Sequence, residues 1–186
     1  QVNVQIVEDK TIRLLPRLRS GRLDLAFVRP PDRRDRGIAF QHLIYETVVV
    51  AIAEQHPLAR HETLVVEDLA DVPLIVPERR SRPHSHDLTM RLFAEAGVSA
   101  CVGQIADEKQ TIINLVAAGF GVALVPRWTS RLAVPGVAYI ALEPPEGVTL
   151  NRLPLSLAWL RNVRDPLRDV VLELLRDRLE RYTERA

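Results

Sequence analysis

Residues 115–126, with the sequence LVAAGFGVALVP, join a predicted helix to a predicted buried strand. The residues at 107–110 have the Asp-x-x-Gln form of a capping box, which predicts a helix over Thr111 to Ala118. Gly119 ends this helix, because glycine adopts the left-handed backbone of a helix end at little cost. The strand from Val122 to Val125 is apolar throughout, as in strands that are buried on both faces of a sheet. A helix and a strand of this kind in succession are typical of an α/β fold.

The first 28 residues also predict a succession of strands and a helix. Val2 to Glu8 alternate apolar and polar side chains, which predicts a strand. Thr11 to Ser20 carries apolar residues on one face and stops at Gly21, which predicts a helix, although Pro16 removes one helical hydrogen bond. Leu23 to Val28 is a nearly continuous apolar run and predicts a buried strand. Strand, helix and strand together form one βαβ unit.

Strands and helices continue to alternate along the chain, which favours mostly parallel sheets. In such sheets, ligands bind at the carboxyl ends of the strands. This rule points to Thr11, to Arg29 and to the polar loop from Glu78 to Asp87 as candidate binding positions. The other predicted elements are strands over 38–43, 47–53, 72–76, 101–106, 137–142 and 153–160, a helix over 88–96, and a C-terminal helix that begins with the cap Asp165 and Pro166.

The composition predicts a folded chain. The 186 residues include 25 Lys and Arg against 24 Asp and Glu, for a net charge of +1, and 47% of them are hydrophobic. This balance argues against nucleic-acid binding by bulk charge. Cys101 is the only cysteine, which excludes an internal disulfide, and its apolar surroundings in the sequence predict an inert core thiol. The longest apolar run, Leu115 to Val125, is shorter than the ~20 residues that span a bilayer.

Motifs for catalysis and metal binding are absent from the sequence. It contains no nucleophile elbow and no phosphate-binding loop. Ser85, His86 and Asp87 are the residue types of a catalytic triad, but adjacency in sequence is not the spatial relay that a triad needs. His84 and His86 lack the third ligand that a metal site needs. We therefore predict no enzyme activity, no metal and no cofactor. No secretory leader is visible, which favours a cytoplasmic protein that does not enter membranes.

Four motifs, in order along the chain, resemble one known family. They are LRSGRLDLAFVRPP at 18–31, HPLA at 56–59, the Asp-Leu and Pro-Leu-Ile pattern within 68–75, and the stretch from Gln110 to Pro126. Together they resemble the effector-binding domain of LysR-type transcriptional regulators, and in particular the aromatic-catabolism subgroup. The resemblance covers nearly the whole chain.

The resemblance implies a two-lobed fold like that of periplasmic binding proteins, with mixed, mostly parallel sheets. Lobe I would comprise residues 1–45 and 148–186, and lobe II residues 46–147, with hinges near Tyr45 and Glu46 and near Pro144 and Pro145. In the family, a further strand and helix of lobe I and a DNA-binding winged helix-turn-helix precede the position of Gln1. We expect these parts upstream of the present chain.

The resemblance also implies a sensor. A small-molecule effector, most simply an anion such as a carboxylate, would bind between the lobes and change the geometry of a homodimer or homotetramer on DNA. Contact with DNA would occur only through the helix-turn-helix domain. The alternative is a solute-binding protein of a transport system, which would have the same fold but would be exported.

Thr11 and Arg29 are candidate effector contacts in lobe I. Related regulators place a threonine at the position of Thr11, where a hydroxyl and the free amides of a helix start favour an anion. The alternative is that Thr11 only caps its helix. Arg29 could bind an anion, or it could pair with Asp32, Asp35 or Glu46.

The candidate contacts in lobe II are Arg82, Pro83, His84 and Ser85. Similar regulators place an effector contact in the matching loop, and arginine, histidine and a helix N-terminus together attract a carboxylate. The alternative is a solvated charged loop, which is the usual fate of a charge cluster.

Overall fold

The structure is a computed structural model, and it describes residues 3–31, 35–143 and 152–183. Contacts within the chain divide it into two units. Unit 1 comprises residues 1–44 and 154–183, and unit 2 consists mainly of residues 45–153. The predicted hinge at Pro144 and Pro145 and the predicted lobe boundary at 147/148 lie outside the described residues.

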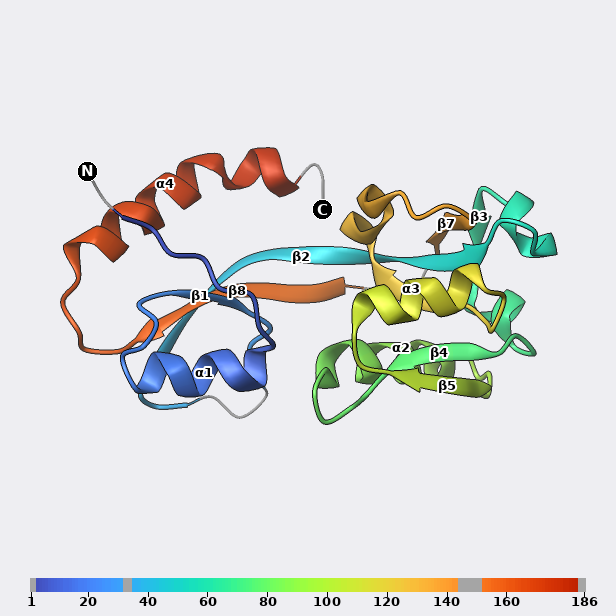
Figure 1. The fold of residues 1–186 in the computed structure, drawn as a ribbon, viewed down its shortest axis with the longest axis horizontal. Helices are drawn as coiled ribbons and strands as arrows, with labels where there is room; N and C mark the ends of the chain where they lie inside the picture. The colour runs from blue at the N-terminus through green and yellow to red at the C-terminus, as the bar shows by residue number, and fades with distance from the viewer. Residues whose placement is uncertain (1–2, 32–34, 144–151, 184–186) are drawn as a thin grey trace. The chain divides into compact units, whose positions relative to one another are not determined.

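Unit 1 is a small sheet packed against a helix. The helix α1 (Thr11–Arg19) packs on β1 (Ala26–Val28), and β1 pairs antiparallel with β8 (Arg152–Leu160), whose other neighbour is β2 (Ile38–Ala53). The arrangement of these elements can be followed in Figure 1. The helix and the strands contribute a cluster of buried side chains to this unit, which consists of Leu14, Leu18, Ala26, Val28, Ile38 and Ala158.

The C-terminal helix α4 (Pro166–Thr183) begins with the predicted cap. The carboxylate of Asp165 accepts hydrogen bonds from the backbone N–H groups of Leu167 (3.0 Å) and Arg168 (3.1 Å). The guanidinium of Arg168 lies 5.8 Å from the ring centre of Trp159 in β8. The apolar stripe of the helix remains exposed at Leu167, Val170, Val171 and Leu174. No helix in the described part of the chain is both long enough and apolar enough to cross a membrane.

Unit 2 contains two sheets. In the larger one, β2 pairs antiparallel with β6 (Ala123–Pro126) and with β7 (Val137–Leu142), and β3 (Thr63–Leu64) pairs parallel with β7. In the smaller one, β4 (Leu74–Pro77) pairs parallel with β5 (Val102–Ala106). Figure 1 shows β4 and β5 side by side.

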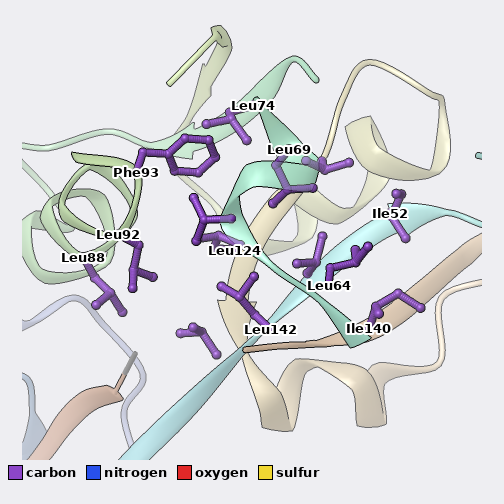
Figure 2. Close-up of a cluster of buried hydrophobic side chains, with 14 of the residues drawn as sticks. Ile52, Leu64, Leu69, Leu74, Leu88, Leu92, Phe93, Leu124, Ile140 and Leu142 are labelled. Carbon is purple, nitrogen blue, oxygen red and sulfur yellow. The ribbon is translucent and has the colours of Figure 1, made fainter. Parts of the chain in front are cut away.

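Two helices pack on β4, α2 (Pro83–Glu95) and α3 (Lys109–Ala117). Short 3₁₀ helices cover 57–60, 66–69 and 127–132. The larger core of unit 2 gathers side chains from both sheets and from α2, as Figure 2 shows. Its labelled members are Ile52, Leu64, Leu69, Leu74, Leu88, Leu92, Phe93, Leu124, Ile140 and Leu142.

The segment before β6 needs a glycine at position 121. Its φ is +147°, and a Cβ atom at this position would lie 2.2 Å from the backbone oxygen of Pro73. Two hydrogen bonds hold the segments this close. The Val122 N–H donates to the Pro73 carbonyl (2.9 Å), and the Ile75 N–H donates to the Val122 carbonyl (2.8 Å). A residue with a side chain would therefore collide with backbone atoms here.

The strand predicted over Val2 to Glu8 is wrong for its described part. Residues 3–8 contain no strand, and the side chains of Val4 and Ile6 are 71% and 92% exposed. A strand needs a neighbour for its backbone hydrogen bonds, and none of the described strands pairs with this segment. The two strands predicted over 38–43 and 47–53 are one continuous strand, β2.

The α/β fold with mixed sheets is confirmed, but the described pairs are not mostly parallel, since β2 pairs antiparallel with both β6 and β7. Strands that are apolar on both faces look the same in sequence whatever their direction. The prediction of a buried Cys101 is also wrong, because this residue is exposed. It precedes β5, which pairs only with β4 among the described strands and is exposed along most of its length.

Candidate functional site

Thr11 and Arg29 come together in unit 1. Thr11 is the first residue of α1, and Arg29 directly follows β1. The backbone N–H of Arg29 donates to the Thr11 hydroxyl oxygen at 3.1 Å, and Arg29 Nη1 donates to the carbonyl of Pro154 at 2.9 Å. The helix N-cap is Lys10, so Thr11 is not the capping residue of α1. Instead, Thr11 connects the start of α1 to the end of β1, and both side chains are half-buried.

The other candidate contacts form the first turn of α2 in unit 2. Arg82 is the N-cap, Pro83 is the first helical residue, and His84 and Ser85 follow, all of them half-buried. The Arg82 side chain makes no cap hydrogen bond, and the first turn carries no acidic residue. The positive end of the helix dipole is therefore not neutralised by a carboxylate within that turn.

The guanidinium of Arg82 is held by the loop that precedes α3. Its Nε donates to the backbone carbonyl of Asp107 at 2.8 Å, and its Nη2 lies 3.5 Å from Glu108 Oε2. The side chain is 29% exposed, whereas that of Glu108 is 62% exposed. One edge of the guanidinium, formed by Nε and Nη2, is thus used within unit 2. Nothing in the sequence indicated this, because the partners lie 25 and 26 residues away.

Ser81 adds a second link to the same loop. Its hydroxyl donates to the carboxylate of Asp107, and its backbone N–H donates to Glu78 Oε2 at 2.9 Å. The N-cap of α3 is Glu108, one residue after the predicted cap Asp107, and the Glu108 side chain makes no cap hydrogen bond. The Asp107 carboxylate accepts from the Ser81 hydroxyl, which the sequence did not indicate.

Three further ionisable residues near the start of α2 interact with one another, namely Arg79, His86 and Asp87. Arg79 Nε donates to Asp87 Oδ1 at 2.7 Å, and His86 Nδ1 lies 3.1 Å from the same oxygen. Burial raises the pKa of Asp87, but the hydrogen bonds and charges of Arg79 and His86 outweigh it, so the pKa lies below its ordinary value. Within the described residues, no group of three His, Cys, Asp or Glu side chains could hold a metal ion.

Lys109, the first residue of α3, was not singled out by sequence reasoning. Its ammonium lies 3.6 Å from the ring centre of Trp128, which belongs to the 3₁₀ helix after β6. This distance is typical of a cation–π contact. The scarcity of lysine was visible in the sequence, but the aromatic partner nearly twenty positions away was not.

Comparisons with known proteins agree with the motifs. Residues 1–180 match the family model described as LysR substrate binding domain. The chain is 56% identical over 182 residues to the HTH-type transcriptional regulator TtuA of Agrobacterium vitis, covering 98% of this chain and 60% of TtuA. It is 32% identical over 181 residues to the regulator CatR of Pseudomonas putida, covering 97% of this chain and 60% of CatR. The chain thus spans about 60% of the length of these relatives.

Solved structures show the same fold. The effector-binding domain of QuiR in complex with shikimate has a TM-score of 0.73 and 26% identity, covering 95% of this chain and 79% of that chain. The BenM effector-binding domain with its effector benzoate has a TM-score of 0.79 and 23% identity, with the same coverage. The family match over 180 residues and the 56% identity to TtuA lead to one conclusion: the chain belongs to the LysR family of transcriptional regulators, as their substrate-binding, or effector-binding, domain.

Proposed function

We propose that this effector-binding domain recognises a small anion, most simply a carboxylate. The start of α2 carries the proposal: an arginine at the N-cap whose side chain makes no cap hydrogen bond, and a first turn without acidic residues, favour a negative charge. In unit 1, the Thr11 hydroxyl and the Arg29 guanidinium are further polar groups. Shikimate and benzoate, which the QuiR and BenM domains bind, are both carboxylates at neutral pH.

We further propose that units 1 and 2 are the two regulatory lobes, and that the effector contacts both. Thr11 and Arg29 would then serve from lobe I, and Arg82, Pro83, His84 and Ser85 from lobe II. An effector can change the arrangement of two lobes only by binding one arrangement more tightly than another. This difference in affinity between the two arrangements would determine how strongly the regulator responds to the effector.

In the whole protein, this domain would control transcription without chemical conversion of its ligand. A helix-turn-helix domain would contact DNA, and a cytoplasmic homodimer or homotetramer would change its geometry there when the effector binds. Full-length CbnR, whose structure in complex with its target DNA has a TM-score of 0.80 to this chain, has the same fold. No observation favours the transport alternative, since TtuA and CatR are transcriptional regulators.

The test is a panel of small carboxylates, including shikimate and benzoate, added to the whole protein in thermal-shift and calorimetric titrations. A carboxylate at 100 times its Kd stabilises the folded state by about 2.7 kcal/mol. Arg82→Ala should weaken its binding about tenfold or more, because hydrogen bonds to charged groups contribute about 1.5–3 kcal/mol.

The matched control is Arg91→Ala, which removes an exposed arginine from the same helix, away from its first turn. It should leave the affinity unchanged. Failure of every carboxylate to stabilise the protein, or equal effects of the two arginine variants, would refute the anion proposal.

A further inference from the structure

The loops that follow β4 and β5 leave the same edge of one sheet. The two strands are parallel and pair Pro77 with Ala106, which are their last residues. The ladder continues by one bond, since the Glu78 N–H donates to the Ala106 carbonyl at 3.3 Å. The start of α2 and the start of α3 therefore lie beside each other, although about 25 residues separate them in sequence.

The loop before α2 folds back on itself first. The Glu78 carbonyl accepts the backbone N–H groups of Ser81 (3.3 Å) and Arg82 (2.9 Å), and the Glu78 carboxylate accepts the Ser81 N–H a second time. These bonds give the loop a turn, but all of them lie within residues 78–82. They do not fix that turn against the rest of unit 2.

The loop before α3 supplies the external anchor. The Asp107 carboxylate accepts from the Ser81 hydroxyl, the Asp107 carbonyl accepts from Arg82 Nε, and Glu108 faces Arg82 Nη2. Ser81 is thus attached to Asp107, and Arg82 is attached to both Asp107 and Glu108. A planar guanidinium that is bound along one edge has few orientations left, unlike a lysine ammonium.

We infer that Asp107 and Glu108 are positioning residues, which hold Ser81 and Arg82 so that the first turn of α2 and the guanidinium keep one orientation. Arg82 uses Nε and Nη2 for this attachment, and its guanidinium has further N–H donors for an anion. The expected effect on effector affinity rests on the proposed function, whereas the attachment of Ser81 and Arg82 to Asp107 and Glu108 does not.

Amide hydrogen exchange in the whole protein tests the attachment without any ligand. Asp107→Ala should speed exchange of the His86 N–H, which donates to the Arg82 carbonyl, about fivefold, the size expected from one lost hydrogen bond. Asp107→Asn keeps an acceptor oxygen and should restore exchange to within about twofold of the unchanged protein. Amides in the last turn of α2 should not change in either variant.

Glu95→Ala is the matched control, because it removes an exposed carboxylate from the far end of α2. If Asp107→Ala and Glu95→Ala give the same exchange at His86, or if Asp107→Asn fails to rescue it, the inference is wrong.

A variant of Arg82 that keeps the positive charge separates the effect of the guanidinium's orientation from the effect of its charge. Arg82→Lys keeps the cation but cannot donate from Nε, so it should also speed exchange at His86 about fivefold. With shikimate and benzoate as probes, any measurable affinity should fall by a similar factor in Asp107→Ala and recover in Asp107→Asn. If neither probe binds, that result counts against the proposed effector class, and the exchange data alone decide whether the attachment exists.

Discussion

Among the glycines that the structure describes, Gly121 is the one whose replacement by alanine should destabilise the domain most. A residue other than glycine in this region of backbone space is strained by about 1–3 kcal/mol. The new Cβ would also lie 2.2 Å from the Pro73 oxygen, which is backbone and cannot rotate away. Relief of the clash weakens the two hydrogen bonds between Pro73, Ile75 and Val122, at about 1 kcal/mol each. The expected loss in free energy of unfolding is thus about 3–5 kcal/mol.

Urea denaturation followed by circular dichroism measures this loss. The control is Gly119→Ala, since Gly119 also has a positive φ (+78°) but a Cβ there would meet nothing within 4 Å. This control should lose only about 1–2 kcal/mol, from backbone strain alone. Equal losses in the two variants would show that the close approach of residue 121 to Pro73 does not contribute, and the reasoning from the clash would fail.

Three further changes test other parts of unit 2. Phe93→Ala empties a fully buried position and should cost about 3–5 kcal/mol in urea unfolding, whereas a loss below about 1 kcal/mol would contradict the packing in Figure 2. The folded-state pKa of Asp87 is lowered, so its stabilising contribution exists above its ordinary value of 3.8 and is lost as the pH falls through the folded pKa. Asp87→Asn should therefore flatten the dependence of unfolding on pH below about 4, and an unchanged slope would contradict the pairing with Arg79. Lys109→Met should lower stability by about 0.5–1 kcal/mol and change the fluorescence of Trp128, and an unchanged spectrum would exclude the contact.

Local signals in the sequence were enough for most helices. Gly119 has the positive φ expected of a helix end, and Asp165 with Pro166 begins α4 as predicted. Such signals succeed because the groups involved are within a few residues of one another. Pairing between strands is not local, which is why the direction of β2 against β6 and β7 could not be predicted.

In the candidate site, too, contacts between segments that are distant in sequence could not be predicted. The sequence placed Arg82 in a polar loop before a helix predicted over 88–96, whereas α2 begins at Pro83 and Arg82 is its N-cap. The sequence also could not show that the guanidinium is attached to residues 107 and 108. It also predicted Asp107 as the cap of its own helix, because a capping box is a local pattern, whereas the N-cap is Glu108. The contact between Ser81 and Asp107 forms only once β4 and β5 lie side by side.

Each unit contains one tryptophan, whose intrinsic fluorescence can be measured. The chain has two tryptophans, Trp159 in unit 1 and Trp128 in unit 2, and each ring faces a cationic side chain. Emission from an indole responds to a charge nearby, so the replacement of either tryptophan by phenylalanine leaves a single chromophore that reports on one unit. Spectra of the two single-tryptophan proteins during denaturation would show whether the units melt together or one after the other.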